Sequence, residues 1–369
     1  MKSIAYVGID AHKDTHTICV LPEGSQEPFL RQTYVADKKA IVEAFRVLAE
    51  RYDLRCCYEA SSCGYVLYRW LTEIGVSCQV IAPSLTPVRP GEHVRTDKRD
   101  ALKLARLYSA GQLTPIRVPT EFEQSVRGLT RLREAVVREV VLAKTLLNQF
   151  LRDQGRVFDG KTRWTQSYWK WLRGQSFSKL DSFVFTEYLG LLEFKLARLH
   201  EIDAQVSEWA QTKTYQPQVK RLCSLRGVGI VTAMTLVAEI IDFKRFASAA
   251  SLMSFLGLVP RENSSGQSQS RGAITKAGNA RCRRILIEAA WKYTRKPAVC
   301  KALKERHEGL PADLIAHSWK AQQRLFKKYW SIANRKEKGK AVVGVARELV
   351  GFIWGIMNSA TLQRPTLQN

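Results

Sequence analysis

Paired cysteines and acidic side chains are both scarce in this sequence of 369 residues. No two of its eight cysteines form a CxxC pair. The adjacent Cys56 and Cys57 would point to opposite faces of a strand, which excludes a disulfide between them or a shared zinc ion. The N-terminus also lacks the long apolar segment of a signal peptide. We therefore expect reduced, mostly buried thiols in a cytoplasmic protein.

The sequence also has little that resembles a membrane span. Its most apolar stretch near the C-terminus begins at Ala341 and is interrupted by Arg347 and Glu348. That stretch falls short of the roughly 20 clean apolar residues that a span needs, so we expect no membrane partner. Hydrophobic residues make up 45% and charged residues 25%, a composition typical of a soluble globular protein with two or three domains.

Positive charge is in excess. Lys and Arg number 58 against 34 Asp and Glu, which gives a net charge of +24. An excess of this size predicts a polyanionic partner, and nucleic acid is the first candidate, although solvated lysines are the alternative. Residues 261–348 hold 21 Lys and Arg against 7 Asp and Glu, so we expect the polyanion to lie largely against this part of the chain.

The first 112 residues predict an α/β domain. Two short β-branched runs, 3–10 and 15–21, flank a turn and predict a hairpin. Further buried strands are expected at 54–60 and 76–82, and helices at 37–52, around 67–74 and at 96–111. This alternation predicts a sheet with helices packed on it.

The middle of the chain predicts a helical linker. Residues 122–152 and 186–212 are long, charged and periodic, which indicates two antiparallel helices in a coiled-coil arm that could serve dimerisation or be merely exposed. Between them, Trp164, Trp169 and Trp171 form either a small packed cap or a stacking surface for nucleic acid, and packing is the favoured interpretation.

The C-terminal part predicts a mostly helical domain. A helix, a glycine turn and a second helix surround Gly227 and Gly229. Such a turn can present backbone N–H groups to a phosphate, or it can be a tight connection without a ligand. Residues 261–279 are interpreted as a loop, and a helix follows from Ala280.

Four carboxylates stand out in this basic chain. Asp10 and Glu59 each end a predicted strand, and Asp97 and Asp100 share one face at the start of a helix. Four carboxylates brought together need a cation, and Mg²⁺ prefers oxygen ligands. Taken singly, Asp10 could be a turn residue, and Asp97 with Asp100 could cap the helix.

These residues carry a family resemblance. GIDAHK at 8–13, YEASSCGY at 58–65 and RTDKRDALKLA at 95–105 resemble the RuvC-like DEDD domain of the insertion-sequence-110 family of transposases. The resemblance implies an RNase H-like fold and metal-ligand roles for Asp10, Glu59, Asp97 and Asp100. It implies three regions, with a RuvC-like domain at 1–115, a helical linker at 116–215 and a transposase domain at 216–369.

The segment 261–279 offers several hydroxyl groups among cations. Chemistry alone does not choose among its serines, which are Ser264, Ser265, Ser268 and Ser270. GLVP-REN-SSG followed by RGAITKAGN and an Arg-rich helix resembles the transposase domain of the same family, in which the serine before the glycine is the nucleophile. The resemblance therefore places that role on Ser265. Candidate nucleic-acid-binding cations are Arg261, Arg271, Lys276, Arg281, Arg283 and Arg284.

The resemblance implies a DNA transposase or recombinase that uses a covalent phosphoserine intermediate and Mg²⁺. It also implies a noncoding guide RNA that pairs with donor and target DNA, and dimers that assemble into tetramers. The alternatives are a metal-only DNA junction nuclease, a site-specific DNA invertase of the same family, and a non-catalytic RNA-binding scaffold.

Overall fold

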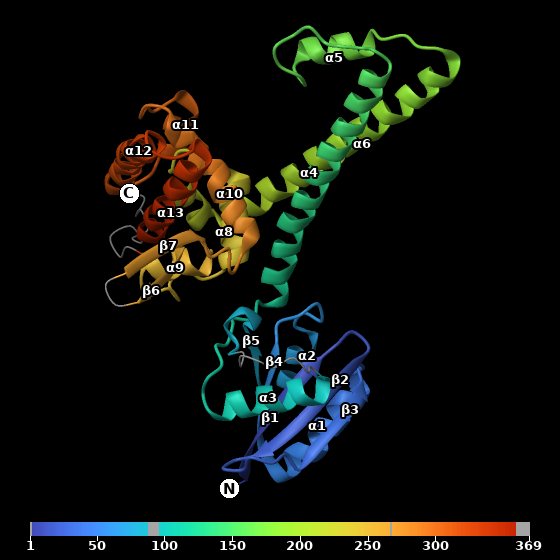
Figure 1. Cartoon of the computed structure of the whole chain (residues 1–369), viewed down its shortest axis with the longest axis vertical. Helices are drawn as coiled ribbons and strands as arrows, with labels where there is room; N and C mark the ends of the chain where they lie inside the picture. The colour runs from blue at the N-terminus through green and yellow to red at the C-terminus, as the bar shows by residue number, and fades with distance from the viewer. Residues whose placement is uncertain (1, 88–95, 266–267, 359–369) are drawn as a thin grey trace. The chain divides into compact units, whose positions relative to one another are not determined.

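The computed structural model describes residues 2–87, 96–265 and 268–358, with only the backbone described for residues 263–265 and 268–271. It divides the chain into two compact units, Met1–Pro119 and Thr120–Asn369, which are described separately (Figure 1). The finer division at residues 115 and 215 stays a prediction.

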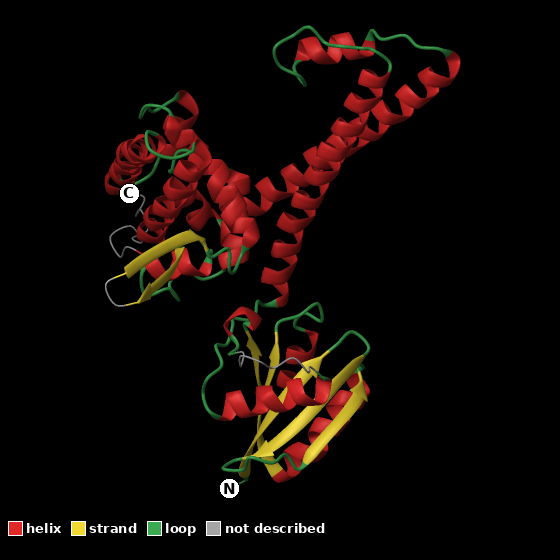
Figure 2. Ribbon diagram, viewed as in Figure 1, coloured by secondary structure: helices red, strands yellow, loops and turns green. Residues whose placement is uncertain are grey.

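The first unit contains a five-stranded mixed sheet (Figure 2). In spatial order the strands are β3 (Leu30–Val35), β2 (Thr15–Pro22), β1 (Ser3–Ala11), β4 (Tyr52–Glu59) and β5 (Ser77–Ile81). β2 runs antiparallel to β1 and β3, and β4 runs parallel to β1 and β5. The predicted hairpin and the two later strands are confirmed. Strand β3 was not predicted, because its mostly exposed residues give no buried pattern.

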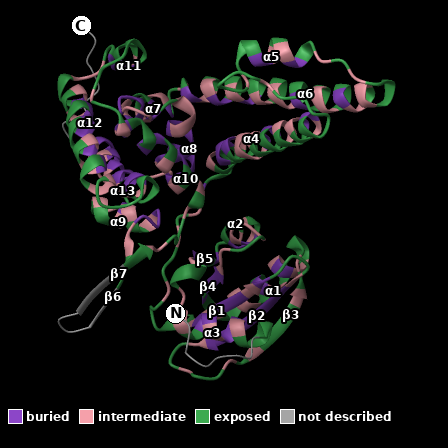
Figure 3. Ribbon diagram, turned by 45° about the horizontal axis from the view of Figure 1, so that its top comes forward, coloured by how far each residue is buried: buried purple, intermediate pink, exposed green. Residues whose placement is uncertain are grey.

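Helices cover both faces of this sheet. α1 (Lys38–Arg51) and α2 (Val66–Glu73) share one buried cluster with alternate residues of β1 and β4, including Ile9 and Tyr58. On the opposite face, α3 (Asp97–Ser109) packs through Leu104 against Cys57 of β4. Figure 3 shows buried residues on the strands between these layers. The sheet is therefore the middle layer. The carboxyl ends of β1 and β4 lie beside α3.

The second unit is mostly helical, with one short hairpin. Its elements are α4 (Glu121–Asp153), α5 (Gln166–Arg173), α6 (Lys179–Ala210), α7 (Gln216–Cys223), α8 (Ile230–Ile240), α9 (Ala249–Phe255), β6 (Pro260–Ser265), β7 (Ser268–Ile274), α10 (Ala280–Ala290), α11 (Lys301–His307), α12 (Ala312–Ala333) and α13 (Lys338–Asn358).

α4 and α6 pair as two long antiparallel helices. Arg133 of α4 pairs with Asp203 of α6, and Glu139 pairs with Lys195, so residue numbers rise along one helix as they fall along the other. The two long helices were predicted; whether they supercoil stays a prediction.

The tryptophan-rich segment packs at the far end of this pair. Trp164, Trp169 and Trp171 are half-buried against a cluster that includes Tyr168 and Leu147. The hydroxyl of Tyr168 also donates a hydrogen bond to Asn148 Oδ1 of α4 at 2.8 Å. The structure therefore supports the packing interpretation of these aromatic residues.

The segment predicted as a loop at 261–279 is a hairpin over most of its length. β6 and β7 pair in the register Asn263 with Ser270, Ser264 with Gln269, and Ser265 with Ser268. The prediction was wrong because a serine-rich ribbon lacks the apolar alternation by which strands are recognised, while backbone hydrogen bonds alone can hold it.

α13 is a core helix despite its apolar sequence. Among the described residues it alone is long and apolar enough to cross a membrane. Nine of its side chains, among them Val342, Leu349 and Ile353, are instead buried in the main core of the second unit. Glu348, which interrupts the apolar run, pairs with Arg324 and Lys328 of α12.

A buried carboxylate ties α4 to this core. Glu239, near the end of α8, accepts two hydrogen bonds from Arg131 at 2.7 and 3.0 Å and one from Asn279 at 2.8 Å. Arg127 of α4 is buried beside it, and Asn279 caps α10. Burial alone would raise the pKa of Glu239, but Arg131, Asn279 and Arg127 outweigh burial and lower that pKa.

A Glu239→Gln variant is expected to unfold about 3 kcal/mol more easily, because it leaves the Arg127 guanidinium buried without its countercharge. Since the folded pKa is lowered, the stabilisation from Glu239 is full above the unfolded value of 4.5 and is lost as the pH falls below it. Urea unfolding at several pH values measures both effects. The exposed Glu337→Gln serves as control, and equal stability of the two variants would contradict the prediction.

Candidate metal centre and serine hairpin

Sheet register brings Asp10 and Glu59 to neighbouring positions. The last paired residues of the parallel strands β1 and β4 are Ile9 and Tyr58, and the two acids come directly after them. Ile9 and Tyr58 are buried on the face covered by α1 and α2. Because strand side chains alternate, Asp10 and Glu59 point to the opposite face, on which α3 lies. Two of the four predicted carboxylates therefore meet at one sheet edge.

The first turn of α3 supplies the other two carboxylates. Thr96, not Asp97, is the N-cap, and its side chain accepts a hydrogen bond from the Arg99 backbone N–H. The alternative interpretation of Asp97 as a cap is therefore wrong. Asp97 and Asp100 both lie in that first turn, where the helix dipole favours negative charge. The turn therefore presents two carboxyl groups on one face.

Asp10, His12 and Asp97 come together as a possible metal-binding group. One ligand atom from each lies within 4.8 Å of the other two. His12 Nε2 is 3.2 Å from Asp10 Oδ2 and 3.7 Å from Asp97 Oδ1. His12 was not singled out from the sequence. The signal was its place in GIDAHK, two residues after Asp10.

The electrostatics of Asp10 show that the carboxylates act on one another. Burial is the largest cause that raises the pKa of Asp10; the nearby His12 lowers that pKa, and the charges of Asp97 and Asp100 raise it. Asp100 thus belongs to the same electrostatic site. A divalent cation would relieve this repulsion.

These residues suit a divalent cation. Ligand oxygens about 2.1 Å from Mg²⁺ lie about 3 Å apart when adjacent, close to the spacing that His12 already has with Asp10. The donor set is mainly carboxylate oxygen, with Glu59 on the adjoining strand. His12 is more than half exposed and Asp10 about one-fifth, so the centre is open to a solvent-borne ligand.

Comparisons with known proteins agree with this site. Residues 7–154 match a family model for DEDD-type transposases, and residues 219–305 match one described as "Transposase IS116/IS110/IS902 family". The putative transposase y4qE of Sinorhizobium fredii is 36% identical over 96% of this chain and 89% of its own length. The transposase for insertion sequence element IS1533 of Leptospira borgpetersenii is 31% identical over 92% and 99%. The chain belongs to the IS110 family of transposases.

Membership makes this protein an enzyme that cuts and rejoins DNA, so the scaffold alternative no longer holds. The first matched region contains all four predicted carboxylates, and the second contains the serine hairpin. In this transposase, Ser265 is the last residue of β6 and pairs with Ser268 across the hairpin. The side chains of Ser265 and Arg271 lie outside the described residues, so their roles stay predictions.

The arginines of α10 have partners inside the transposase. Arg281 and Arg284 pair with Glu134 of α4 at 2.7 and 3.5 Å. Arg283 donates hydrogen bonds to the carbonyl oxygens of Leu256 and Ala277 at 3.0 and 3.2 Å. These contacts give the three arginines a structural role, and their predicted contacts with nucleic acid stay predictions. Arg261 and Lys276 are exposed beside the hairpin.

The glycine turn between α7 and α8 has a packing reason. Gly227 has φ +83°, and a Cβ there would lie 2.5 Å from the carbonyl oxygen of Ala289. Gly229 is the N-cap of α8, and a Cβ there would meet nothing within 4 Å. Close backbone approach thus accounts for glycine at position 227. No such contact explains Gly229, and its phosphate contact stays a prediction.

Gly8 positions the acidic turn of α3. A Cβ at Gly8 would lie 2.1 Å from the carbonyl oxygen of Ala101 and 2.5 Å from the backbone nitrogen of Ala105. Only glycine lets α3 pack this close to β1. The separation of Asp97 from Asp10 therefore depends on a residue without a side chain.

A Gly8→Ala variant is expected to bind Mn²⁺ about 10-fold to 100-fold more weakly, because α3 must move and carry Asp97 and Asp100 with it. Calorimetric titration of the purified protein measures the affinity. Gly190→Ala, where an added Cβ meets nothing within 4 Å, is the control and should bind as the natural protein does. Unchanged affinity in Gly8→Ala would refute the positioning role.

Proposed function

We propose that this transposase cuts and rejoins donor and target DNA through a covalent phosphoserine intermediate on Ser265, with Mg²⁺ held by Asp10, Glu59, Asp97 and Asp100. The observation that carries the metal part is the convergence of Asp10, His12 and Asp97 at the end of β1. The serine part is supported by the match of residues 219–305 to the family model and rests on the resemblance noted in the sequence.

The proposed reaction needs no separate energy source, because one phosphorus–oxygen bond forms for each one that breaks. The Ser265 hydroxyl oxygen attacks the scissile phosphorus, an O–P bond forms, and the P–O3′ bond breaks. The serine hydroxyl gives up its proton, and the departing 3′ oxygen takes up a proton, so the step is balanced in protons. A 3′ hydroxyl of another strand then attacks the 5′-phosphoserine and restores Ser265. A bound Mg²⁺ would neutralise the carboxylates and stabilise charge on the attacking and leaving oxygens.

The remaining parts of the proposal concern fold, partners and location. The five-stranded mixed sheet and the DEDD-type match support an RNase H-like first domain. A net charge of +24 suits a protein that holds RNA together with DNA, and binding should weaken steeply with salt. The proposal also includes guidance by a noncoding RNA and a cytoplasmic location. It includes dimerisation through the α4–α6 pair, with dimers that assemble into tetramers.

One reaction tests the central claim. The protein, Mg²⁺, labelled donor DNA and transcripts of the DNA flanking its gene are mixed and resolved on a denaturing gel. Labelled DNA that remains attached to protein, and is released by protease, is the expected result. Cleaved DNA with free ends and no attached protein would instead identify a metal-only nuclease and overturn the phosphoserine intermediate.

A further inference from the structure

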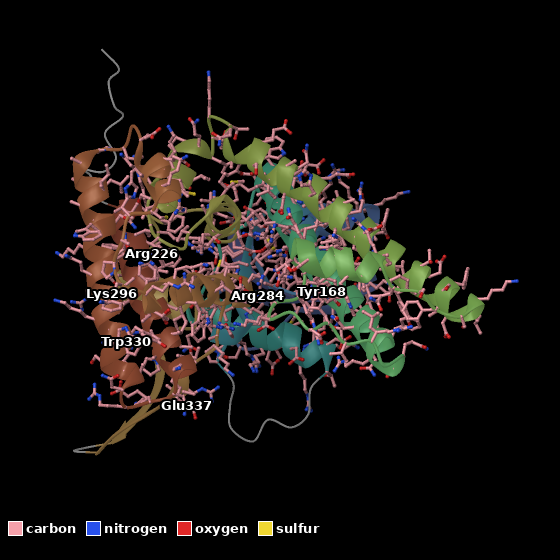
Figure 4. All side chains as sticks on the ribbon, turned by 90° about the horizontal axis from the view of Figure 1, so that it is seen from above. Tyr168, Arg226, Arg284, Lys296, Trp330 and Glu337 are labelled. Carbon is pink, nitrogen blue, oxygen red and sulfur yellow. The ribbon has the colours of Figure 1, made fainter. Side chains whose placement is uncertain are left out.

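A wide groove lies at the base of the serine hairpin. It has a volume of about 1130 Å³ and runs between the β6–β7 base and the turn that joins α12 to α13. Pro260, Gly272 and Ile274 line the hairpin side, and the helical side includes Arg335, Lys336 and Lys340. Figure 4 shows Glu337, a lining residue, near the point where the hairpin leaves the helices.

The groove is strongly basic. Four cations line it, Arg335, Lys336, Lys340 and Arg347, against the single acid Glu337. Glu337 pairs with Lys340 at 3.4 Å, but both side chains are well exposed, so the pair is weak and easily replaced.

The other lining cations keep their charge uncompensated. The Arg335 side chain, just past the end of α12, donates to the carbonyl oxygen and hydroxyl of Ser331 in that helix. Within the part of the chain that the structure describes, Lys336 and Arg347 have no ion-pair partner. The α10 arginines differ, since Glu134 pairs with Arg281 and Arg284, and Glu288 also pairs with Arg284. The groove therefore keeps a net positive charge that a partner can neutralise.

The lining favours a phosphate backbone over unpaired bases. Its floor includes Gly272, Ala273, Gly339 and Gly344, which allow close approach. Among its described lining residues there is no aromatic ring on which a base could stack. The volume exceeds the roughly 300–1,000 Å³ of ordinary small-molecule sites, which suits an extended ligand. A duplex bound through its phosphates meets each of these conditions.

We propose that this groove holds the phosphate backbone of the DNA duplex being cut, about 17 Å from the scissile phosphate. This distance is measured from Ser265, so it rests on the proposed role of that residue. Pro260, at the groove, and Ser265 are the two ends of β6. At about 3.3 Å per residue they are about 17 Å apart, which sets the distance along the DNA between the groove and the cut.

The first test removes charge from the groove. A Lys336→Gln/Lys340→Gln double variant is compared with the natural protein for binding a labelled duplex that spans the gene's flanking DNA, without divalent cations. Two lost phosphate contacts should reduce the slope of log affinity against log salt by about 2, and affinity at low salt should fall about tenfold. Both lysines are exposed, so the variant should fold normally.

A matched control separates local contact from overall charge. Lys301→Gln/Lys304→Gln removes the same charge from exposed positions on α11, which does not line the groove. Its salt slope should stay within experimental error of the natural value. An unchanged slope in the groove variant, or an equal reduction in the control, overturns the proposal.

The second test locates the contact on the DNA. Single phosphates are replaced by neutral methylphosphonates along each strand, and the cleavage position is mapped on the same duplex. The natural protein should lose affinity when phosphates about 17 Å from the cut are neutralised, and the groove variant should be insensitive there. If affinity fell only when phosphates at other positions were neutralised, the proposed distance between the groove and the cut would be refuted.

The two tests also separate this proposal from the proposed function. A reduced salt slope without any protein–DNA adduct would retain the groove and reject the Ser265 intermediate. An adduct together with an unchanged slope would retain the intermediate and reject the groove.

Discussion

An Asp10→Asn variant is expected to lose metal-dependent DNA cleavage by at least about 10²-fold, the loss that follows removal of one preorganised electrostatic group. The amide keeps the size of the carboxyl group but has no charge and one oxygen fewer. Burial, His12, Asp97 and Asp100 all affect the pKa of Asp10. The charge of Asp10 is therefore central to the metal centre.

The same variant should be no less stable than the natural protein. Burial raises the pKa of Asp10 in the folded state, so the folded protein binds a proton there more readily than the unfolded chain does. Stability without metal therefore falls as the pH rises from 3.8 through the raised pKa, and asparagine removes this loss. A residue that costs stability is expected to serve function and not the fold.

Thermal unfolding without divalent cations and the cleavage assay together check this prediction. Asp14→Asn, an exposed acid four residues away on the turn after β1, is the control and should retain cleavage. Cleavage retained by Asp10→Asn would exclude the metal role. A melting temperature clearly below that of Asp14→Asn would show that Asp10 supports the fold instead.

The first unit was predictable because its strands are buried. β1 and β4 place alternate apolar residues such as Val7 and Cys56 in the core, which the sequence displays as β-branched and apolar runs. β3 pairs with β2 through its backbone while most of its side chains are exposed, so the sequence offers no such signal. The serine hairpin escaped prediction because its sequence lacks apolar alternation.

The acidic residues of the candidate site could be predicted from the sequence, but the residues that position them could not. Strand ends and helical spacing pointed to Asp10, Glu59, Asp97 and Asp100 because those signals are local in sequence. The close approach at Gly8 depends on where α3 packs, and the pairing of Arg281 with Glu134 joins residues far apart in the chain. Basic residues are therefore poor guides to nucleic-acid contacts until their intramolecular partners are known.

Replacing Ser265 with alanine is expected to eliminate the covalent protein–DNA adduct below detection, because no other atom in the proposed step forms the bond to phosphorus. The change removes one hydroxyl from a hairpin that backbone pairing holds together, so the fold should persist.

Ser264→Ala is the matched control, because it removes the same group one residue earlier on the same strand and should leave the adduct intact. The two serines are consecutive residues of β6, so the pair of variants separates one position from the next. Loss of the adduct in Ser264→Ala alone would move the nucleophile by one position. Loss in neither variant would show that the protein attacks phosphorus with another group, and the phosphoserine intermediate would have to be abandoned.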